Sequence, residues 1–261
     1  MPQQPALAPD GARPGAVAAV PHPAQAPGAT APGHPLDNPV RSALLGPHAG
    51  LAARNGVALR YPADVSPFVA LPDRPDARAW RDLAALVAPG SVVGAVGSPE
   101  EVPADWELVQ ELPGVQLVGD AVRTGPDEEA VRLGPADVPE MLALVERTQP
   151  GPFLPRTVEL GRYLGIRRGG VLVAMAGERL RPPGWTELSA VCTAESHRGQ
   201  GLASRLVRAV AAGVRERGDT PFLHTAAVNT GAIRLYEALG FRQRRQVTFL
   251  VLRAPGGGPG E

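Results

Sequence analysis

Two glycines stand at the mouth of a segment that has the pattern of a long helix. The stretch ESHRGQGLASRLV, residues 195–207, places Gly199 and Gly201 just before apolar residues that recur every four positions. A glycine inside a helix costs about 0.5–1 kcal/mol relative to alanine. The first turn of a helix has unpaired N–H groups and the positive end of the helix dipole, which together suit a phosphate. Bare glycine backbone and the charged donor Arg198 would complete such a site.

The glycine stretch by itself leaves two interpretations open. It lacks the Gly-Lys-Ser/Thr of a P-loop and the third glycine of the dinucleotide fingerprint. A turn that begins a helix explains the residues as well as a phosphate site does. A second motif, NTGAIRLYEALGF at residues 229–241, follows the first in order, with a helix and a strand expected between them.

Taken in order, LSAVCTAESHRGQGLASRLV and NTGAIRLYEALGF strongly resemble the GNAT superfamily of N-acetyltransferases, over about residues 129–253. The first stretch matches the family element R/Q-x-x-G-x-G/A, which in relatives binds the pyrophosphate of acetyl-CoA. The second stretch matches N-x-x-A-x-x-L-Y-x-x-L-G-F. The matching positions are Arg198, Gly201, Ala203, Asn229, Ala232, Leu235, Tyr236, Leu239, Gly240 and Phe241.

The resemblance implies a site for acetyl-CoA as co-substrate. Residues 199–204 would surround the pyrophosphate with N–H groups, and the strand expected over residues 187–193 would pair through its backbone with pantetheine. A splay or bulge in that strand would free an N–H for the thioester oxygen. Strand residues alternate in direction, so Val191 and Thr193 are the expected contacts, while Cys192 faces the core. The residues assigned to cofactor binding are Val191, Cys192, Thr193, Arg198, Gly199, Gln200, Gly201, Leu202, Ala203, Ser204 and Asn229.

Two residues are candidates for proton transfer. Glu187 lies four residues before Val191 and is expected on the same strand face, where a carboxylate could take a proton from an acceptor ammonium. Its alternative is a solvated strand residue, with Glu178 as the reserve base. The match to LYEALGF implies that Tyr236 protonates the departing thiolate; the alternative is a core tyrosine. Asn229 can both cap its helix and contact the cofactor.

The resulting prediction is an N-acetyltransferase that moves an acetyl group from acetyl-CoA to an amine by direct attack. The sequence leaves two alternatives: a longer acyl donor or non-amine acceptor, and a non-catalytic module that senses acyl-CoA or holds a partner. Cys192 is the only cysteine and the five histidines are scattered, so no metal site is expected. Acceptor identity and a homodimer are left open.

The expected elements form an α+β fold with one mixed, mostly antiparallel sheet flanked by helices. In the first region, helices are expected over residues 38–54 and 75–89, and strands at VALRY, SVVGAV, WELVQEL and VQLVGDAV. In the second region, helices are expected at GPADVPEMLALVERT, TVELGRYLG, the glycine motif and NTGAIRLYEALG. Strands are expected at EAVRL, GIRR, VLVAMAGERL, WTELSAVCT, PFLHTAAV and QVTFLVLR.

Composition indicates four segments along the chain: a Pro/Ala/Gly-rich tail over residues 1–35, an α/β region over 36–124, the GNAT-like domain over 125–253 and a loose tail over 254–261. The first region is compatible with a degenerate copy of the same fold and is expected to shape the acceptor site. A formal net charge of zero favours neither nucleic acid nor an anionic membrane as partner. Without a signal-peptide pattern or a long apolar run, a cytoplasmic protein is expected.

Overall fold

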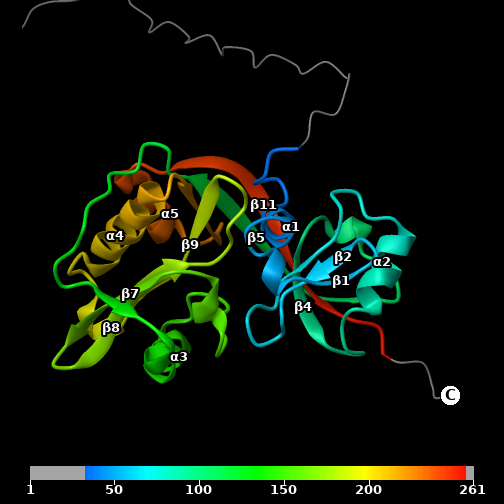
Figure 1. Ribbon diagram of the computed structural model, residues 1–261, viewed down its shortest axis with the longest axis horizontal. Helices are drawn as coiled ribbons and strands as arrows, with labels where there is room; N and C mark the ends of the chain where they lie inside the picture. Colours follow the sequence, from blue (N-terminus) through cyan, green and yellow to red (C-terminus); the bar gives the residue numbers. More distant parts are fainter. Residues whose placement is uncertain (1–32, 257–261) are drawn as a thin grey trace, which may run out of the picture. The chain divides into compact units, whose positions relative to one another are not determined.

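This computed structural model describes residues 33–256 (Figure 1). Its main element is a sheet of eight strands. The strand order is β4-β11-β5-β10-β9-β8-β7-β6, and every neighbouring pair is antiparallel except β9 with β10. The strands are β4 (Val92–Val96), β5 (Glu107–Val118), β6 (Val131–Leu133), β7 (Tyr163–Arg168), β8 (Val171–Glu178), β9 (Trp185–Thr193), β10 (Thr220–Ala226) and β11 (Arg242–Arg253). This mixed, mostly antiparallel sheet confirms the expected fold class.

Helices cover both faces of the strands β7 to β9. Along β8, Ala174 and Ala176 pack in one apolar cluster with the helix α4 (Leu202–Glu216), whereas Met175 packs in another with α3 (Val138–Thr148). Successive strand residues point to opposite faces, so α3 and α4 lie on opposite sides of the sheet. The helix α5 (Thr230–Leu239) joins the cluster of α4.

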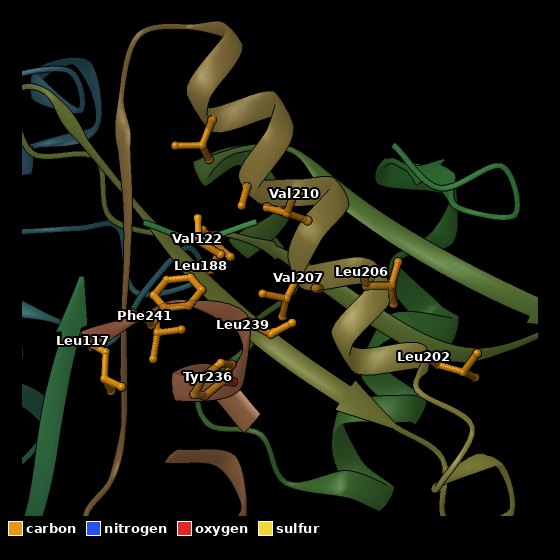
Figure 2. Packing of buried hydrophobic residues seen from close by; sticks show 14 of the residues in the cluster. Leu117, Val122, Leu188, Leu202, Leu206, Val207, Val210, Tyr236, Leu239 and Phe241 are labelled. Atoms are coloured by element: carbon orange, nitrogen blue, oxygen red, sulfur yellow. The ribbon is translucent and has the colours of Figure 1, made fainter. Parts of the chain in front are cut away.

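The apolar stripe of α4 makes the core that the sequence predicts. Leu202, Leu206, Val210 and Val214 are all buried, and the helix ends before Gly218, which has a left-handed φ of 82°. Figure 2 shows Val207, on the same helix, directed toward Leu239 of α5; Tyr236 and Phe241 belong to the same apolar cluster. This packing fixes the beginning of α4 relative to α5.

The first region builds a small layer and also enters the large sheet. Its three-stranded sheet has the order β1-β2-β3. The elements are β1 (Ala53–Asn55), β2 (Ala58–Arg60), β3 (Val69–Ala70), and the helices α1 (Pro39–Leu45) and α2 (Ala77–Ala84). The strands β4 and β5 belong to the eight-stranded sheet, where β5 lies between β10 and β11. The expected border near residue 124 therefore falls between two strands of one sheet.

Three expectations about single elements were wrong. The helix expected over residues 38–54 ends at Leu45, because Gly46 and Pro47 follow it and residues 49–51 form only a 3-10 turn. The second short helix of the second region is a 3-10 turn, η4 (Thr157–Leu160), which gives way to β7 after the extended Gly161. WELVQEL and VQLVGDAV form the single strand β5, and the Pro-Gly pair stands where the pairing with β10 begins at Gly114.

The ends of the chain are described only in part. Of the expected tail over residues 1–35, residues 1–32 lie outside the described part, and Leu36 just after it is buried in the core. At the other end residues 257–261 lie outside it, whereas Ala254 is buried and donates its N–H to the carbonyl of Ser91.

Candidate active site

The parallel strands β9 and β10 separate part-way along their length. Their pairing runs from Trp185 opposite Thr220 to Leu188 opposite Leu223 and goes no further. Beyond it β9 continues to Thr193 and β10 to Ala226, each held by its other neighbour in the sheet. The diverging ends leave main-chain edges facing each other across a gap.

A bulge lies in β9 at the point where the strands separate. Ala190 has a left-handed φ of 53°, and the register with β8 slips between Ser189 and Cys192. A non-glycine residue in this conformation costs about 1–3 kcal/mol and is typical of functional sites. The bulge expected in this strand is therefore present.

A cavity of about 540 Å³ occupies the gap and extends toward the first region. Its floor includes Leu188, Ser189, Ala190 and Val191 of β9. The remaining lining residues are Pro67, Phe68, Val92, Val93, Gly94, Leu112, Pro113, Gln149, Pro150, Gly151, Pro152, Arg179, His224, Thr225, Ala226, Asn229, Ala232, Tyr236, Phe249, Leu250 and Val251. Both regions of the chain thus contribute to one site.

The glycine motif presents a row of free N–H groups at the beginning of α4. Gly199 and Gly201 have φ values of 78° and 71°, and a Cβ at either position would meet open space. The N–H groups of residues 199–204 donate no hydrogen bond to any residue of the described chain. Arg198 is exposed beside them. This is the arrangement that an anionic group at a helix N-terminus requires.

The three expected contacts of β9 divide between the two faces of the strand. Val191 lines the cavity, and Thr193 is half-buried with a hydroxyl that has no partner within residues 33–256. Cys192 is buried in the cluster around α3, and burial raises the pKa of its thiol. Its side chain therefore packs in the core, as the alternation of the strand predicts.

Two residues of the second motif reach the cavity from α5. Asn229 caps the helix, because its Oδ1 accepts the N–H of Ala232 at 3.1 Å, and it also lines the cavity. Tyr236 lines the cavity next to Phe241, whose ring centroid lies 5.9 Å away. Burial, reinforced by Cys192, raises the pKa of Tyr236 to about 12. The phenol therefore keeps its proton at neutral pH.

Glu187 does not line the cavity and is fully buried behind it. Its carboxylate accepts hydrogen bonds from Nε and Nη2 of Arg179 at 2.8 and 2.7 Å, and from Nδ1 of His224 at 2.7 Å. Burial alone would raise its pKa, but the charge and hydrogen bonds of Arg179, with His224, hold the pKa at about 2. The geometry does not favour direct proton abstraction by this carboxylate. The reserve candidate Glu178 is also buried, in an ion pair with Arg217 at 2.8 Å.

His224 links Glu187 to Gln116 of the first region, because its ring lies within hydrogen-bond distance of both side chains. The amide of Gln116 is oriented by Arg244, which donates to its oxygen, and by the carbonyl of Leu36, which accepts from its nitrogen. That nitrogen also lies 3.0 Å from Nε2 of His224 and can only donate. Nε2 of His224 is therefore the acceptor, and its proton sits on Nδ1, facing Glu187.

Sequence reasoning missed Arg179 and gave His224 no role. Arg179 follows β8 and lies opposite Glu187, since its N–H donates to the carbonyl of Glu187 at 3.0 Å. Two opposite charges eight residues apart in apolar strands around a turn were the available signal. His224 could not be assigned because its neighbours Gln116 and Glu187 come from distant parts of the sequence.

Within the described part of the chain, no three His, Cys, Asp or Glu side chains converge as a metal site would require. None of the helices in residues 33–256 combines the length and apolar character needed to cross a bilayer.

Comparison with known proteins points to one family. A family model described as FR47-like protein matches residues 163–250. Over 98 residues the chain is 34% identical to N-acetyltransferase 8B of Rattus norvegicus, a match covering 32% of this chain and 44% of that protein. The chain thus spans less than half the length of this curated relative.

Two solved structures resemble the chain over most of its length. A protein of Novosphingobium aromaticivorans DSM 12444, assigned to the GNAT family as an acetyltransferase, is 41% identical with a TM-score of 0.78. That similarity covers 84% of this chain and 98% of the other. A GCN5-related N-acetyltransferase from Kribbella flavida is 21% identical with a TM-score of 0.54, covering 84% of this chain and 95% of that one. The second likeness shows the fold alone.

Proposed function

Because the chain belongs to the GNAT family of acetyltransferases, we propose that it transfers an acetyl group from acetyl-CoA to an amine by direct attack. The observation that carries this proposal is the row of unpaired N–H groups at residues 199–204, beside strands that separate around a cavity. A pyrophosphate satisfies the first feature and an extended pantetheine arm the second. Acetyl-CoA supplies the activated acetyl group.

The backbone of this chain would bind the donor. The N–H groups of Gly199 to Ser204 and the guanidinium of Arg198 hold the pyrophosphate. Val191 and Asn229 line the cavity next to the bulge, and Thr193, at the end of β9, would contact the pantetheine arm. At the bulge, an N–H of Ala190 or Val191 donates to the thioester oxygen as negative charge develops on it.

The transfer requires two proton movements that balance. The amine nitrogen forms a bond to the acetyl carbon and the carbon–sulfur bond breaks. A general acid gives its proton to the departing thiolate, and its conjugate base then accepts the proton that the nitrogen loses, directly or through water, which restores the acid. Tyr236 lines the cavity with its proton retained, because its pKa is about 12. It therefore donates to the departing sulfur.

The acceptor amine would react as its free base. The cavity wall is mainly apolar, and its charged group is Arg179, so desolvation and a like charge both lower the pKa of a bound ammonium. Glu187 then acts indirectly: its hydrogen bonds hold the side chains of Arg179 and His224 in place. This role replaces direct proton abstraction by Glu187 in the proposed mechanism.

One observation favours the alternative of an acyl-CoA sensor. No carboxylate from residues 33–256 lines the cavity, so a conventional general base is missing there. A longer acyl donor is a second variant of the same chemistry, since the cavity wall beyond the bulge is mostly apolar.

The test is a coupled measurement of turnover and binding with the full chain. Purified protein is mixed with acetyl-CoA and a panel of amines, free CoA thiol is followed over time, and acetyl-CoA binding is measured by calorimetry. We expect thiol release that depends on an amine and acetylated product by mass spectrometry. Binding of acetyl-CoA without turnover of any amine would establish the sensor, and faster reaction with butyryl-CoA or octanoyl-CoA would establish the longer donor.

A further inference from the structure

One wall of the cavity is apolar and is built from separate strands and loops. Phe68 precedes β3, Val92 begins β4, Leu112 lies in β5 and Phe249 lies in β11. Phe68 and Phe249 lie with ring centroids 6.2 Å apart. Val92 and Leu112 are 48% and 40% exposed and form the rim. The apolar part of an acceptor that binds here loses its contacts with water and gains contacts with aromatic and aliphatic side chains.

Arg179 is the charged side chain in this lining, as far as the described residues go. Its Nε and Nη2 are bound to Glu187, while Nη1 donates no hydrogen bond to any residue within 33–256. The guanidinium carbon lies over the Phe68 ring, 5.1 Å from its centroid, so the group is in contact with the apolar wall. The guanidinium of Arg179 is therefore held at the cavity, and its Nη1 is available to donate a hydrogen bond to a ligand.

The charges around the cavity discriminate between classes of amine. An acceptor with a second ammonium group, such as a polyamine, meets Arg179 and no carboxylate in the described lining. Burying such a charge without a partner is costly. A carboxylate close to the reacting amine instead receives a charge-assisted hydrogen bond from Nη1. An apolar substituent on the same molecule fills the wall formed by Phe68 and Phe249.

We propose that the acceptor is an apolar amino acid, or an amine of the same design with a carboxylate beside the nitrogen and a hydrophobic body. Nη1 of Arg179 binds the carboxylate, and Phe68, Phe249, Val92 and Leu112 contact the hydrophobic group. This assignment rests on the proposed acetyl transfer and adds to it the residues that select the acceptor. Glu187 is a positioning residue here, because it holds Arg179 in place.

The test compares three amines that differ in one feature each, using the full chain, acetyl-CoA and thiol release. L-Phenylalanine has the amine, the ring and the carboxylate; phenethylamine lacks only the carboxylate; L-lysine replaces the ring by a second ammonium. We expect kcat/KM for L-phenylalanine to exceed that for phenethylamine by about 10–100-fold, the effect of one charge-assisted hydrogen bond. We expect L-lysine to be disfavoured as well, because it keeps the carboxylate but places an unpaired ammonium in the cavity instead of the ring. A preference for phenethylamine or L-lysine would overturn the proposal.

Two variants locate the effect. The double variant Arg179→Gln/Glu187→Gln removes both buried charges together, and we expect the ratio of kcat/KM between L-phenylalanine and phenethylamine to fall toward one. A ratio that stays at the wild-type value would contradict the role of Arg179.

Val92→Glu, at the exposed rim, puts a carboxylate where the acceptor enters, with Val92→Gln as its control. We expect L-phenylalanine to lose several-fold more kcat/KM in the glutamate variant, largely through KM. Equal values in the two variants would place the acceptor elsewhere. Failure of the proposed function is distinguishable, since then no amine of the wider panel releases thiol although acetyl-CoA binds. Turnover of another amine but of none of these three would overturn the acceptor assignment alone.

Discussion

The two walls of the cavity are built from different materials. The wall proposed for the donor is mostly main chain within residues 189–236: the bulged strand β9 and α5 line the cavity, and the glycine motif lies outside that lining. The wall proposed for the acceptor is formed by side chains: Phe68, Val92, Arg179 and Phe249 line the cavity from distant points of the sequence. Main-chain groups stay the same when side chains are substituted, so a wall made of them suits a donor that is always the same molecule. Substitutions in a wall of side chains can change which acceptor binds while the position of the donor stays the same.

We expect the largest effect from deleting the first region of the chain, which contributes residues to the cavity. Deleting residues 1–128 takes away β5 and leaves β10 and β11 with open edges inside the sheet. We expect the remaining chain to be insoluble or unfolded and inactive, as measured by circular dichroism and thiol release. Deleting residues 1–32 leaves every described contact in place and is the control. A folded, fully active chain from residue 129 onward would refute the shared site.

Glu187→Gln is expected to have the next largest effect, on stability. It leaves Arg179 buried without its partner, which costs about 3–5 kcal/mol. The wild-type pKa of about 2 lies below that of an unfolded glutamate. The stabilisation is therefore complete above about pH 5 and is lost as the pH falls toward 2. Urea unfolding at pH 7 and pH 3 should show a smaller loss in the variant than in wild type.

The control for Glu187→Gln is the double variant with Arg179→Gln, which removes the unpaired charge and should recover part of the stability. A Glu187→Gln protein as stable as wild type but with a kcat lowered by two orders of magnitude would favour direct base catalysis by Glu187 after all.

Tyr236→Phe isolates the chemical step on the donor side. Removing the phenol proton should lower kcat by about 10²-fold, a typical contribution of general acid catalysis, with the KM of acetyl-CoA nearly unchanged. Tyr163→Phe is the matched control, because the Tyr163 hydroxyl is buried without a partner among the described residues and lies outside the cavity lining. Equal kcat in both variants would assign Tyr236 to the core alone.

Gly201→Ala gives the smallest expected effect and tests the donor wall alone. Alanine at a φ of 71° costs about 1 kcal/mol in stability, and its Cβ projects where a phosphate would approach. We expect the KM of acetyl-CoA to rise about tenfold while the KM of the acceptor is unchanged. Gly170→Ala, in the turn between β7 and β8 at a φ of 83°, carries the same backbone cost without a place in the site. An equal KM in both variants would exclude the glycine motif from binding.

The difference between the walls also explains what the sequence could predict. The donor wall is local, so its glycines, the cap at Asn229 and the helix stripe from Leu202 to Val214 can be read as patterns. The acceptor wall depends on strand register: Arg179 meets Glu187 only because β8 and β9 pair as they do. The same limit applies to β5, where Pro113 and Gly114 resemble a break in sequence but lie in a continuous strand.

The position of β5 has a consequence for how the protein is made. Glu107, at the beginning of β5, pairs with Arg253, the last residue of β11, and is bonded to it through side chains as well. During synthesis β5 leaves the ribosome long before either of its neighbours. Such distant pairings are slow to form and leave apolar strands exposed in the meantime. The cavity therefore cannot form until β11 has been translated and has paired with β5.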